Sequence, residues 1–477
     1  MDGTYRFGPF ELDAGRGLLL RDGEPLKVPH RHIAMLALLV SRAGQLVTKD
    51  ELFHAGWAGE ATGDNSIAHA IWTIRKTLGD NLEEPRFIKT QVGLGYRFIA
   101  PVTRVPPPMA VTSVAALVTP HRTFMEGHAA IDTMDVEAVS HARQRLVAAL
   151  ADASDSAAAH IDLATACILE FEATRVKAAP DTSRLDEALA HAETACRIDP
   201  RSGQAWSTLA LVQQKSGDVA DALASASKAA TLDGNDWRHL LRLGFACWGE
   251  ERLRAAHRLK QVAPDFAGAH WLEATVLIAR RAFDAAIETL RAGAALQDAQ
   301  RKHAGPFNAV GLHLLHGSVL GGLGRVDDAL EELSRELARA DERHLYSREC
   351  CANSWYAAGA LHRRSGRCDD ADRAFRRALA LVPGHALARI GLAALSGELI
   401  PESIPGAVSA LDPIVVAAAR LSAQSRDDEA ARMAADSLAA ARPGPDGWQL
   451  PIDPLVHAAA HRDAWAEPLR ILHDRAA

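Results

Sequence analysis

The chain has 477 residues, of which 48% are hydrophobic and 5% aromatic, and its formal net charge is −7. This length exceeds what a single hydrophobic core organises, and the hydrophobic content excludes an intrinsically disordered protein. The negative charge excludes a protein that coats nucleic acid over its whole surface. The charge is uneven, because residues 1–104 carry 13 basic and 12 acidic side chains, whereas the remainder carries 40 and 48.

The sequence shows no cysteine motif, secretory signal or membrane-spanning run, and this indicates the cellular location. The six cysteines form no CxxC pair, which argues against a zinc site or a disulfide framework. The first residues show no basic region followed by an apolar one, so no secretory signal is expected. The apolar run 109–118 is about half as long as a membrane span. We therefore expect a cytoplasmic protein without a membrane segment.

The first part of the chain predicts a small sheet followed by two helices. Residues 5–29 alternate apolar and polar side chains between glycine-containing turns, which is typical of antiparallel strands. Helical spacing of apolar residues predicts a first helix over 30–42. Thr48 and Glu51, three residues apart, form the pattern of a capping box and predict a second helix that ends near Trp57.

A third helix is predicted over residues 66–79, after a loop at 58–65. At 100° per residue, its buried face is expected to consist of Ile67, Ile71, Ile74 and Leu78. The opposite face holds polar residues with one aromatic residue at its flank: His69, Thr73, Lys76 and Trp72.

Residues 85–99 predict two strands joined by a glycine-containing tip. This hairpin and the residues just after it are basic and carry no acid after Glu84: Arg86, Lys89, Arg97 and Arg104. A helix followed at once by a small basic hairpin is the DNA-contacting edge of a winged helix-turn-helix. On this hypothesis Arg75 and Lys76 neutralise phosphates, Thr73 and His69 hydrogen-bond to bases, and Trp72 contacts a thymine methyl group or a sugar. The alternative is an ordinary amphipathic helix with a solvated polar face.

Five motifs follow one another in this region: Val47-Thr48-Lys49-Asp50-Glu51-Leu52, Trp57, Ile74-Arg75-Lys76-Thr77-Leu78-Gly79-Asp80, Pro85-Arg86-Phe87-Ile88-Lys89-Thr90 and Gly93-Leu94-Gly95-Tyr96-Arg97-Phe98. With these motifs in this order, residues 4–101 resemble the OmpR/PhoB-type winged-helix domain. The resemblance implies a four-stranded N-terminal sheet, a third helix in the major groove and a hairpin at the minor groove. It also implies that the loop before the third helix contacts RNA polymerase, here through Gly59, Glu60 and Asp64.

Two positions depart from the family pattern. Val92 stands where many members carry an arginine before the first glycine of the hairpin tip, and Gln91 is the nearest substitute. Thr73 replaces an arginine that many members carry on the third helix, so the target sequence should differ. No receiver domain precedes Tyr5, so we expect no control by aspartate phosphorylation. The layout is similar to that of one-component regulators such as ToxR, CadC and HilA, without the membrane span that some of these contain.

The remainder predicts a helical array behind a proline-rich linker. Small residues, single Trp or Phe residues and helix-ending prolines recur, most clearly from Trp355 to Pro383, at the spacing of the 34-residue tetratricopeptide repeat. We expect six or seven units between about 169 and 444, an irregular unit at 237–266 and a terminal cap at 448–477. The predicted domains are a head at 1–103, a linker at 104–122 and a repeat domain at 123–477. The predicted fold class is thus an α+β winged-helix head followed by an all-α tetratricopeptide-repeat solenoid.

Other chemistry is not indicated. His313 and His316 share a helix face, but the sequence supplies no third or fourth metal ligand. The vicinal cysteines Cys350 and Cys351 suit either a redox switch or helix packing, and we favour packing. No GxxxxGK[ST] loop occurs, and no nucleophile with its base stands out. We therefore expect no metal, no other cofactor and no enzymatic activity.

Two hypotheses remain for function. The first is a sequence-specific transcription regulator that binds double-stranded DNA through His69, Trp72, Thr73, Arg75, Lys76, Arg86, Lys89, Gln91 and Arg97. Its partners would be DNA, RNA polymerase, a homodimer mate on DNA and an unknown protein or small-molecule ligand of the repeat domain, which would act as sensor, oligomerisation or docking module. Such a protein would associate with the nucleoid when bound to DNA. The second is a protein–protein scaffold with a vestigial DNA-binding head.

Overall fold

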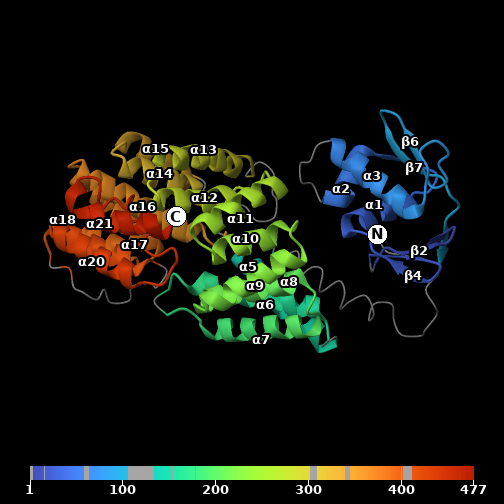
Figure 1. Ribbon diagram of the computed structural model, residues 1–477, viewed down its shortest axis with the longest axis horizontal. Helices are drawn as coiled ribbons and strands as arrows, with labels where there is room; N and C mark the ends of the chain where they lie inside the picture. The colour runs from blue at the N-terminus through green and yellow to red at the C-terminus, as the bar shows by residue number, and fades with distance from the viewer. Residues whose placement is uncertain are drawn as a thin grey trace. The chain divides into compact units, whose positions relative to one another are not determined.

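The computed structural model describes residues 4–15, 17–57, 64–105, 131, 134–152, 155–177, 179–300, 309–338, 344–398, 400 and 411–477. The chain divides into two compact units, residues 1–113 and 114–477 (Figure 1). Each unit has its own hydrophobic core, and we describe them separately.

The head begins with an antiparallel sheet, as the alternating pattern predicted. Its strands are β1 (Thr4–Phe7), β2 (Phe10–Asp13), β3 (Leu18–Arg21) and β4 (Glu24–Leu26), joined by β8 (Thr103–Val105) in the order β4-β3-β2-β1-β8. The four-stranded sheet implied by the family resemblance is present, and β8 is an addition that was not expected. Arg104 pairs with Tyr5, so the head sheet reaches two residues into the stretch expected to be linker.

Three helices and a second sheet complete the head. The helices are α1 (His30–Ser41), α2 (Lys49–Trp57) and α3 (Asp64–Leu78), and the strands are β5 (Leu46–Thr48), β6 (Ile88–Gln91) and β7 (Gly95–Phe98) in the order β5-β7-β6. The predicted capping box is confirmed, because the Glu51 carboxylate accepts the Thr48 N–H at 2.9 Å and the Thr48 hydroxyl accepts the Glu51 N–H at 3.3 Å. The bond from the Thr48 N–H, followed by hydrogen bonds from Arg42 and the Thr48 hydroxyl, lowers the pKa of Glu51 to about 2.

Phenylalanine rings tie the two sheets of the head together. Phe7 on β1 meets Phe98 on β7 at a ring-centroid distance of 5.0 Å with an edge-to-face angle of 79°. Phe87, which precedes β6, packs edge-on against Phe10 on β2 at 5.6 Å. Such aromatic pairs add about 0.5–1.5 kcal/mol beyond the area they bury. The hairpin β6–β7 is therefore anchored in the core of the head.

The second unit is built from helices, each of which packs on the next along the chain. They are α5 (Val136–Asp152), α6 (Ala157–Thr174), α7 (Ser183–Ile198), α8 (Gly203–Ser216), α9 (Val219–Leu232), α10 (Trp237–Ala246), α11 (Gly249–Val262), α12 (Gly268–Ala279), α13 (Phe283–Gln300), α14 (Leu312–Gly322), α15 (Val326–Leu337), α16 (Ser347–Arg364), α17 (Cys368–Leu381), α18 (Ala386–Ser396), α19 (Pro413–Ala423), α20 (Asp427–Ala440) and α21 (Arg462–Arg475). Figure 1 shows them stacked as an array of hairpins. The predicted tetratricopeptide-repeat solenoid is confirmed.

Small residues let the two helices of a repeat approach closely, as predicted. An added Cβ at Gly359 on α16 would lie 2.8 Å from ring atoms of Phe375 on α17, which leaves no room for a side chain. Ala371 and Ala378 on α17 are fully buried in the same contact region. The bulky ring of Phe375, also fully buried, fills the space that the small residues leave.

The irregular unit at 237–266 is present as predicted, and the predicted terminal cap at 448–477 is only partly helical. The unit at 237–266 is short, since α10 has only ten residues and is joined to α11 by Cys247 and Trp248. The cap expected over 448–477 is helical only in α21, where Trp465 is fully buried. Arg280 donates to the carbonyl oxygen of Ala476 at 2.7 Å, so the end of the chain returns to the middle of the array. None of the helices that the structure describes is long and apolar enough to cross a membrane.

Candidate nucleic-acid interface

One face of α3 is exposed and carries the predicted contact residues. Trp72 is 56% exposed, the His69 ring stacks on it at a centroid distance of 5.7 Å, and the Lys76 ammonium lies 5.3 Å from its ring centroid. The Thr73 hydroxyl donates to the carbonyl oxygen of His69 at 2.9 Å, which leaves its lone pairs free to accept. This face of α3 thus presents the indole ring of Trp72, the ammonium group of Lys76, and the polar side chains of His69 and Thr73.

The opposite face of α3 is buried as expected. Ile67, Ile71, Ile74 and Leu78 are each at most 4% exposed and belong to the core of the head. His32 of α1 is also buried, at 5% exposed, and lies within electrostatic range of His69. Burial, followed by the neighbouring Arg31 and His69, lowers the pKa of His32, so this imidazole is neutral at pH 7. His32 therefore adds no positive charge near α3 at this pH.

Arg75 is the one predicted contact on α3 that the structure contradicts. Its side chain points inward, the residue is only 8% exposed, and Nη2 donates to the carbonyl oxygen of Ile88 at 2.8 Å and to the hydroxyl of Thr90 at 2.9 Å. Burial lowers the pKa of this guanidinium. Arg75 thus connects α3 to β6 and is not placed to neutralise a phosphate. Its position four residues after Ile71, only 40° around the helix, was the overlooked signal.

Asp80 makes a second connection that the sequence interpretation missed. Its carboxylate accepts the backbone N–H groups of Arg86, Phe87 and Ile88 at 2.6, 3.2 and 2.8 Å. Asp80 follows Gly79, which ends α3 with φ of +66°. A Gly-Asp pair at a helix end, eight residues before a strand, could have suggested this role. Arg75 and Asp80 together hold α3 and the hairpin as one rigid unit.

The hairpin presents its polar residues on one side. Lys89 and Arg97 are direct cross-strand neighbours, and Gln91 pairs with Gly95. Alternation along the strands places these side chains opposite Ile88 and Phe98, which face the core. Lys89 is exposed, whereas Arg97 and Gln91 are half-buried. Arg86, just before β6, is exposed with its guanidinium 5.7 Å from the Phe87 ring centroid.

The tip of the hairpin is apolar. Val92 is 93% exposed and Leu94 61% exposed, on either side of Gly93 with φ of +77°. Gly95 begins β7, and an added Cβ there would lie 2.1 Å from the carbonyl oxygen of Val47 on β5. The glycine is required because β5 passes directly against it. A basic side chain at the tip is absent, in line with the departure noted at Val92.

The loop expected to contact RNA polymerase is only partly described. Gly59 and Glu60 lie outside the residues that the structure describes, and Asp64 is the first residue of α3. This expectation therefore stays a prediction.

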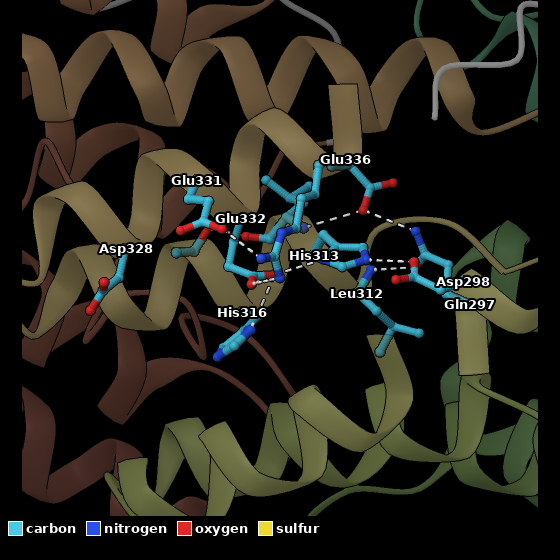
Figure 2. Close-up of polar contacts among 12 residues, drawn as sticks. Gln297, Asp298, Leu312, His313, His316, Asp328, Glu331, Glu332 and Glu336 are labelled. Carbon is cyan, nitrogen blue, oxygen red and sulfur yellow. Dashed lines mark hydrogen bonds and ion pairs between the residues drawn. The ribbon is translucent and has the colours of Figure 1, made fainter. Parts of the chain in front are cut away.

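The histidines considered for a metal site lie in an ion-pair network instead (Figure 2). His313 on α14 faces two carboxylates, with Nδ1 2.7 Å from Glu332 Oε2 and Nε2 2.9 Å from Asp298 Oδ1. His316 Nδ1 lies 3.3 Å from the same Glu332 oxygen. No cluster of histidine, cysteine or carboxylate side chains suited to a metal ion occurs among the described residues.

The vicinal cysteines are packed among helices. Cys351 is 5% exposed, Cys350 is half-buried, and both are free thiols. Burial raises the pKa of both, which disfavours the reactive thiolate.

Comparison with known proteins assigns both units. A family described as "Transcriptional regulatory protein, C terminal" matches residues 23–98, and a family described as "Tetratricopeptide repeat" matches residues 352–395. The transcriptional regulator HilA of Salmonella typhimurium is 35% identical over 92 residues, which are 19% of this chain and 16% of HilA. The chain therefore matches only a small part of that relative.

Solved structures resemble each unit separately. The DNA-binding domain of RstA from Klebsiella pneumoniae, solved in complex with the RstA box, is 33% identical, covering 20% of this chain and 96% of that one with a TM-score of 0.19. A tetratricopeptide repeat protein from Parabacteroides merdae is 13% identical, covering 59% and 100% with a TM-score of 0.41. The two family matches and the similarity to HilA show that the head is an OmpR/PhoB-type winged-helix domain, a DNA-binding type associated with transcription regulation, and that it is joined to tetratricopeptide repeats.

Proposed function

We propose that this protein is a sequence-specific transcription regulator of the one-component type, in which the winged-helix head binds DNA and the repeat array serves as sensor, oligomerisation or docking module. The observation that carries the proposal is the exposed His69, Trp72, Thr73 and Lys76 surface on α3, fixed to a basic hairpin by Arg75 and Asp80. A helix held in this way can enter the major groove without reorganising its support.

Each exposed residue has a role in this proposal. Lys76, Lys89 and Arg86 neutralise phosphates, and Arg97 supports them from its half-buried position. Thr73 and His69 form hydrogen bonds with base edges, and Trp72 packs on a thymine methyl group or a sugar. Gln91 hydrogen-bonds in the minor groove next to the apolar tip. Arg75 does not contact DNA in this proposal; it is a positioning residue that holds α3 against the hairpin.

The remaining partners belong to the same proposal. The loop 58–65 would contact RNA polymerase, two heads would bind as a homodimer on tandem half-sites, and the protein would act in the cytoplasm at the nucleoid. A protein or small ligand bound by the repeat array would shift the population of DNA-binding conformations. These steps follow from the family of the head and from the adjoining array.

The salt dependence of DNA affinity tests the proposal. The full-length protein is titrated onto genomic DNA fragments at several salt concentrations, followed by fluorescence anisotropy. Counterion release predicts a linear fall of log affinity with log salt, and Lys76→Ala should reduce the magnitude of the slope by about one. Lys27, exposed just after β4, supplies the matched control, since Lys27→Ala should leave the slope unchanged.

A protein–protein scaffold with a vestigial head, the alternative function, should show no salt-dependent affinity for DNA. The absence of a basic residue at the exposed tip, where Val92 stands, is the observation in its favour. A protein without salt-dependent affinity for DNA would support it, and equal slopes for Lys76→Ala and Lys27→Ala would remove α3 from the interface.

A further inference from the structure

A cavity of about 700 Å³ lies in the repeat domain, where two segments that are far apart in the sequence meet. One side is built by the start of α5, the end of α6 and the start of α7, and the other side by residues 344–348, which lead into α16. Small-molecule sites in proteins typically occupy about 300–1,000 Å³. The cavity therefore has the size of a ligand site.

Backbone contacts hold the two segments of this cavity together. Asp135 and His344 form an isolated antiparallel bridge, and the Leu345 N–H donates to the carbonyl oxygen of Met134 at 2.9 Å. Three of these four residues line the cavity themselves: Asp135, His344 and Leu345. The position of one wall relative to the other is thus fixed by main-chain hydrogen bonds, as expected of a preformed site.

Part of the cavity wall is apolar. Val139 on α5, Leu169 on α6 and Leu345 are buried residues that line it. Ala173 on α6 and Val176 just after that helix are half-buried and line it as well. A wall of this composition can take the hydrocarbon part of a small ligand out of water.

Most carboxylates of the lining are already bound within the protein. Glu170 Oε2 lies 3.0 Å from Arg184 Nε, so this acid and this cation of the lining serve each other. Asp135 accepts two backbone N–H groups at the start of α5, at 3.0 and 2.9 Å. Asp181 accepts a serine hydroxyl at 2.5 Å. Glu137, which is exposed, is the remaining acid of the lining.

Two cations of the lining differ from Arg184 in this respect. Lys177, just after α6, and Arg348, in the first turn of α16, are exposed. Within the described part of the chain, neither side chain is joined to an acid by a hydrogen bond or an ion pair. Two unpaired cations thus face the single unpaired acid Glu137. Ammonium and guanidinium groups beside an apolar wall suit an oxyanion attached to a hydrocarbon body.

We propose that this cavity binds a small organic anion, whose apolar body lies against Val139, Leu169 and Leu345 and whose carboxylate or phosphate group is held by Lys177 and Arg348. Because one wall belongs to α5–α7 and the other leads into α16, a bound anion links the start of the repeat domain to its later part. As the ligand site of a sensor module, the cavity rests on the proposed function, whereas its occupation is measurable without DNA.

Isothermal titration calorimetry of the full-length protein in the absence of DNA tests the cavity. The probes are sodium 2-naphthoate and 2-naphthyl phosphate, which share an apolar body and differ in their oxyanion, and the uncharged 2-naphthamide. At least one of the two anions should bind at one site per chain, about tenfold or more tightly than the amide, because only an oxyanion forms charge-assisted hydrogen bonds with both cations. The comparison of the two anions distinguishes a carboxylate ligand from a phosphate ligand.

Substitutions in the lining locate the bound anion. The double variant Lys177→Gln, Arg348→Gln should weaken binding about tenfold or more and unfold at the original temperature, because both side chains are exposed. Ala173→Phe should weaken binding of the anion by occupying the space beside the apolar wall. Arg432→Gln, at an exposed arginine of α20, is the matched control and should bind as the unmodified protein does.

Three results would each overturn the proposal. They are the binding of neither anion, equal affinity for the amide and the anions, and full affinity in the double variant. None of these results bears on DNA affinity, which the salt titration of Lys76→Ala measures separately. A failure of the ligand site is therefore distinguishable from a failure of DNA recognition.

Discussion

Arg75 on α3 donates from one nitrogen to both the carbonyl oxygen of Ile88 and the hydroxyl of Thr90, the latter at 2.9 Å on the first strand of the hairpin. The Arg75–Thr90 bond joins residues that are 15 positions apart in the sequence. Any DNA contact made by α3 is therefore mechanically coupled to the hairpin. The angle between the two is fixed by a charge-assisted hydrogen bond rather than by packing alone.

Loss of this bond should destabilise the head. Arg75→Ala removes the donor to the buried carbonyl oxygen of Ile88, at a cost of about 1–3 kcal/mol, whereas the exposed Thr90 hydroxyl can bond to water instead. Chemical denaturation, followed by Trp72 fluorescence, measures the effect. Arg86→Ala, at an exposed arginine nearby, should change stability by less than about 0.5 kcal/mol. If Arg75→Ala instead retained full stability and lost affinity for DNA, the positioning role would be wrong.

Thr73 should determine base preference without affecting phosphate contacts. Thr73→Val keeps the shape of the side chain but removes the hydroxyl, whose lone pairs are free in the structure. Discrimination at one base pair should fall by about 1–3 kcal/mol, while the salt slope stays constant. Parallel selections of random DNA by both proteins measure this. An unchanged preference in Thr73→Val would move the base contact to another residue of the face.

Gly95 should be intolerant of any side chain. Gly95→Ala places a Cβ 2.1 Å from the carbonyl oxygen of Val47, so β5 and β7 must separate, at a cost of about 1–3 kcal/mol. Gly93→Ala, at the tip with open space around it, meets only the penalty of a positive φ, about 1 kcal/mol. Urea denaturation of both variants should rank them in this order, and the reverse order would contradict the close passage of β5.

The His313 network should make the repeat domain less stable at high pH. Burial by itself lowers the pKa of His313, but hydrogen bonds to Glu332 and Asp298 outweigh it and the pKa is raised. Both ring nitrogens lie within hydrogen-bond distance of carboxylates, which requires the protonated form. Among the described residues, His316, Arg335, Glu331 and Glu336 are further charged or titratable groups packed around the network.

The direction of the pH effect follows from linkage. Because the folded pKa lies above the unfolded value near 6.5, the stabilisation is complete below about pH 6.5 and is lost as pH rises through the folded pKa. His313→Gln should flatten the stability profile above about pH 6.5, where the unmodified protein loses this stabilisation. His141→Gln, at an exposed histidine of α5, should not alter the profile. A variant profile that falls as steeply as that of the unmodified protein would exclude His313 as its cause.

Much of the head could be predicted because its signals are local. The capping box of Thr48 and Glu51 needs three residues of sequence, and the exposed face of α3 follows from helical periodicity. The small residues opposite Phe375 likewise recur at the repeat spacing. The DNA contact predicted for Arg75 is wrong because this residue lies beside Ile71, at the edge of the buried face of α3. A long side chain at the edge of a buried face can satisfy its charge inside the domain.

The features that escaped prediction depend on distant contacts. Strand β8 forms because Arg104 pairs with Tyr5, and no periodicity within three residues reveals such a partner. The ion pair of Arg175 and Glu349 joins the end of α6 to the start of α16, and only the folded array brings these two residues together. Pairings at this separation are specified by the whole fold rather than by any segment.

Selection of genomic DNA fragments by the purified full-length protein tests DNA recognition by the exposed face of α3. One sequence motif should be enriched, and the double variant Thr73→Ala, Lys76→Ala should lose this enrichment while its repeat domain unfolds at the original temperature. Enrichment of the same motif by the double variant, or of no motif by the unmodified protein, would contradict DNA recognition through the exposed face of α3.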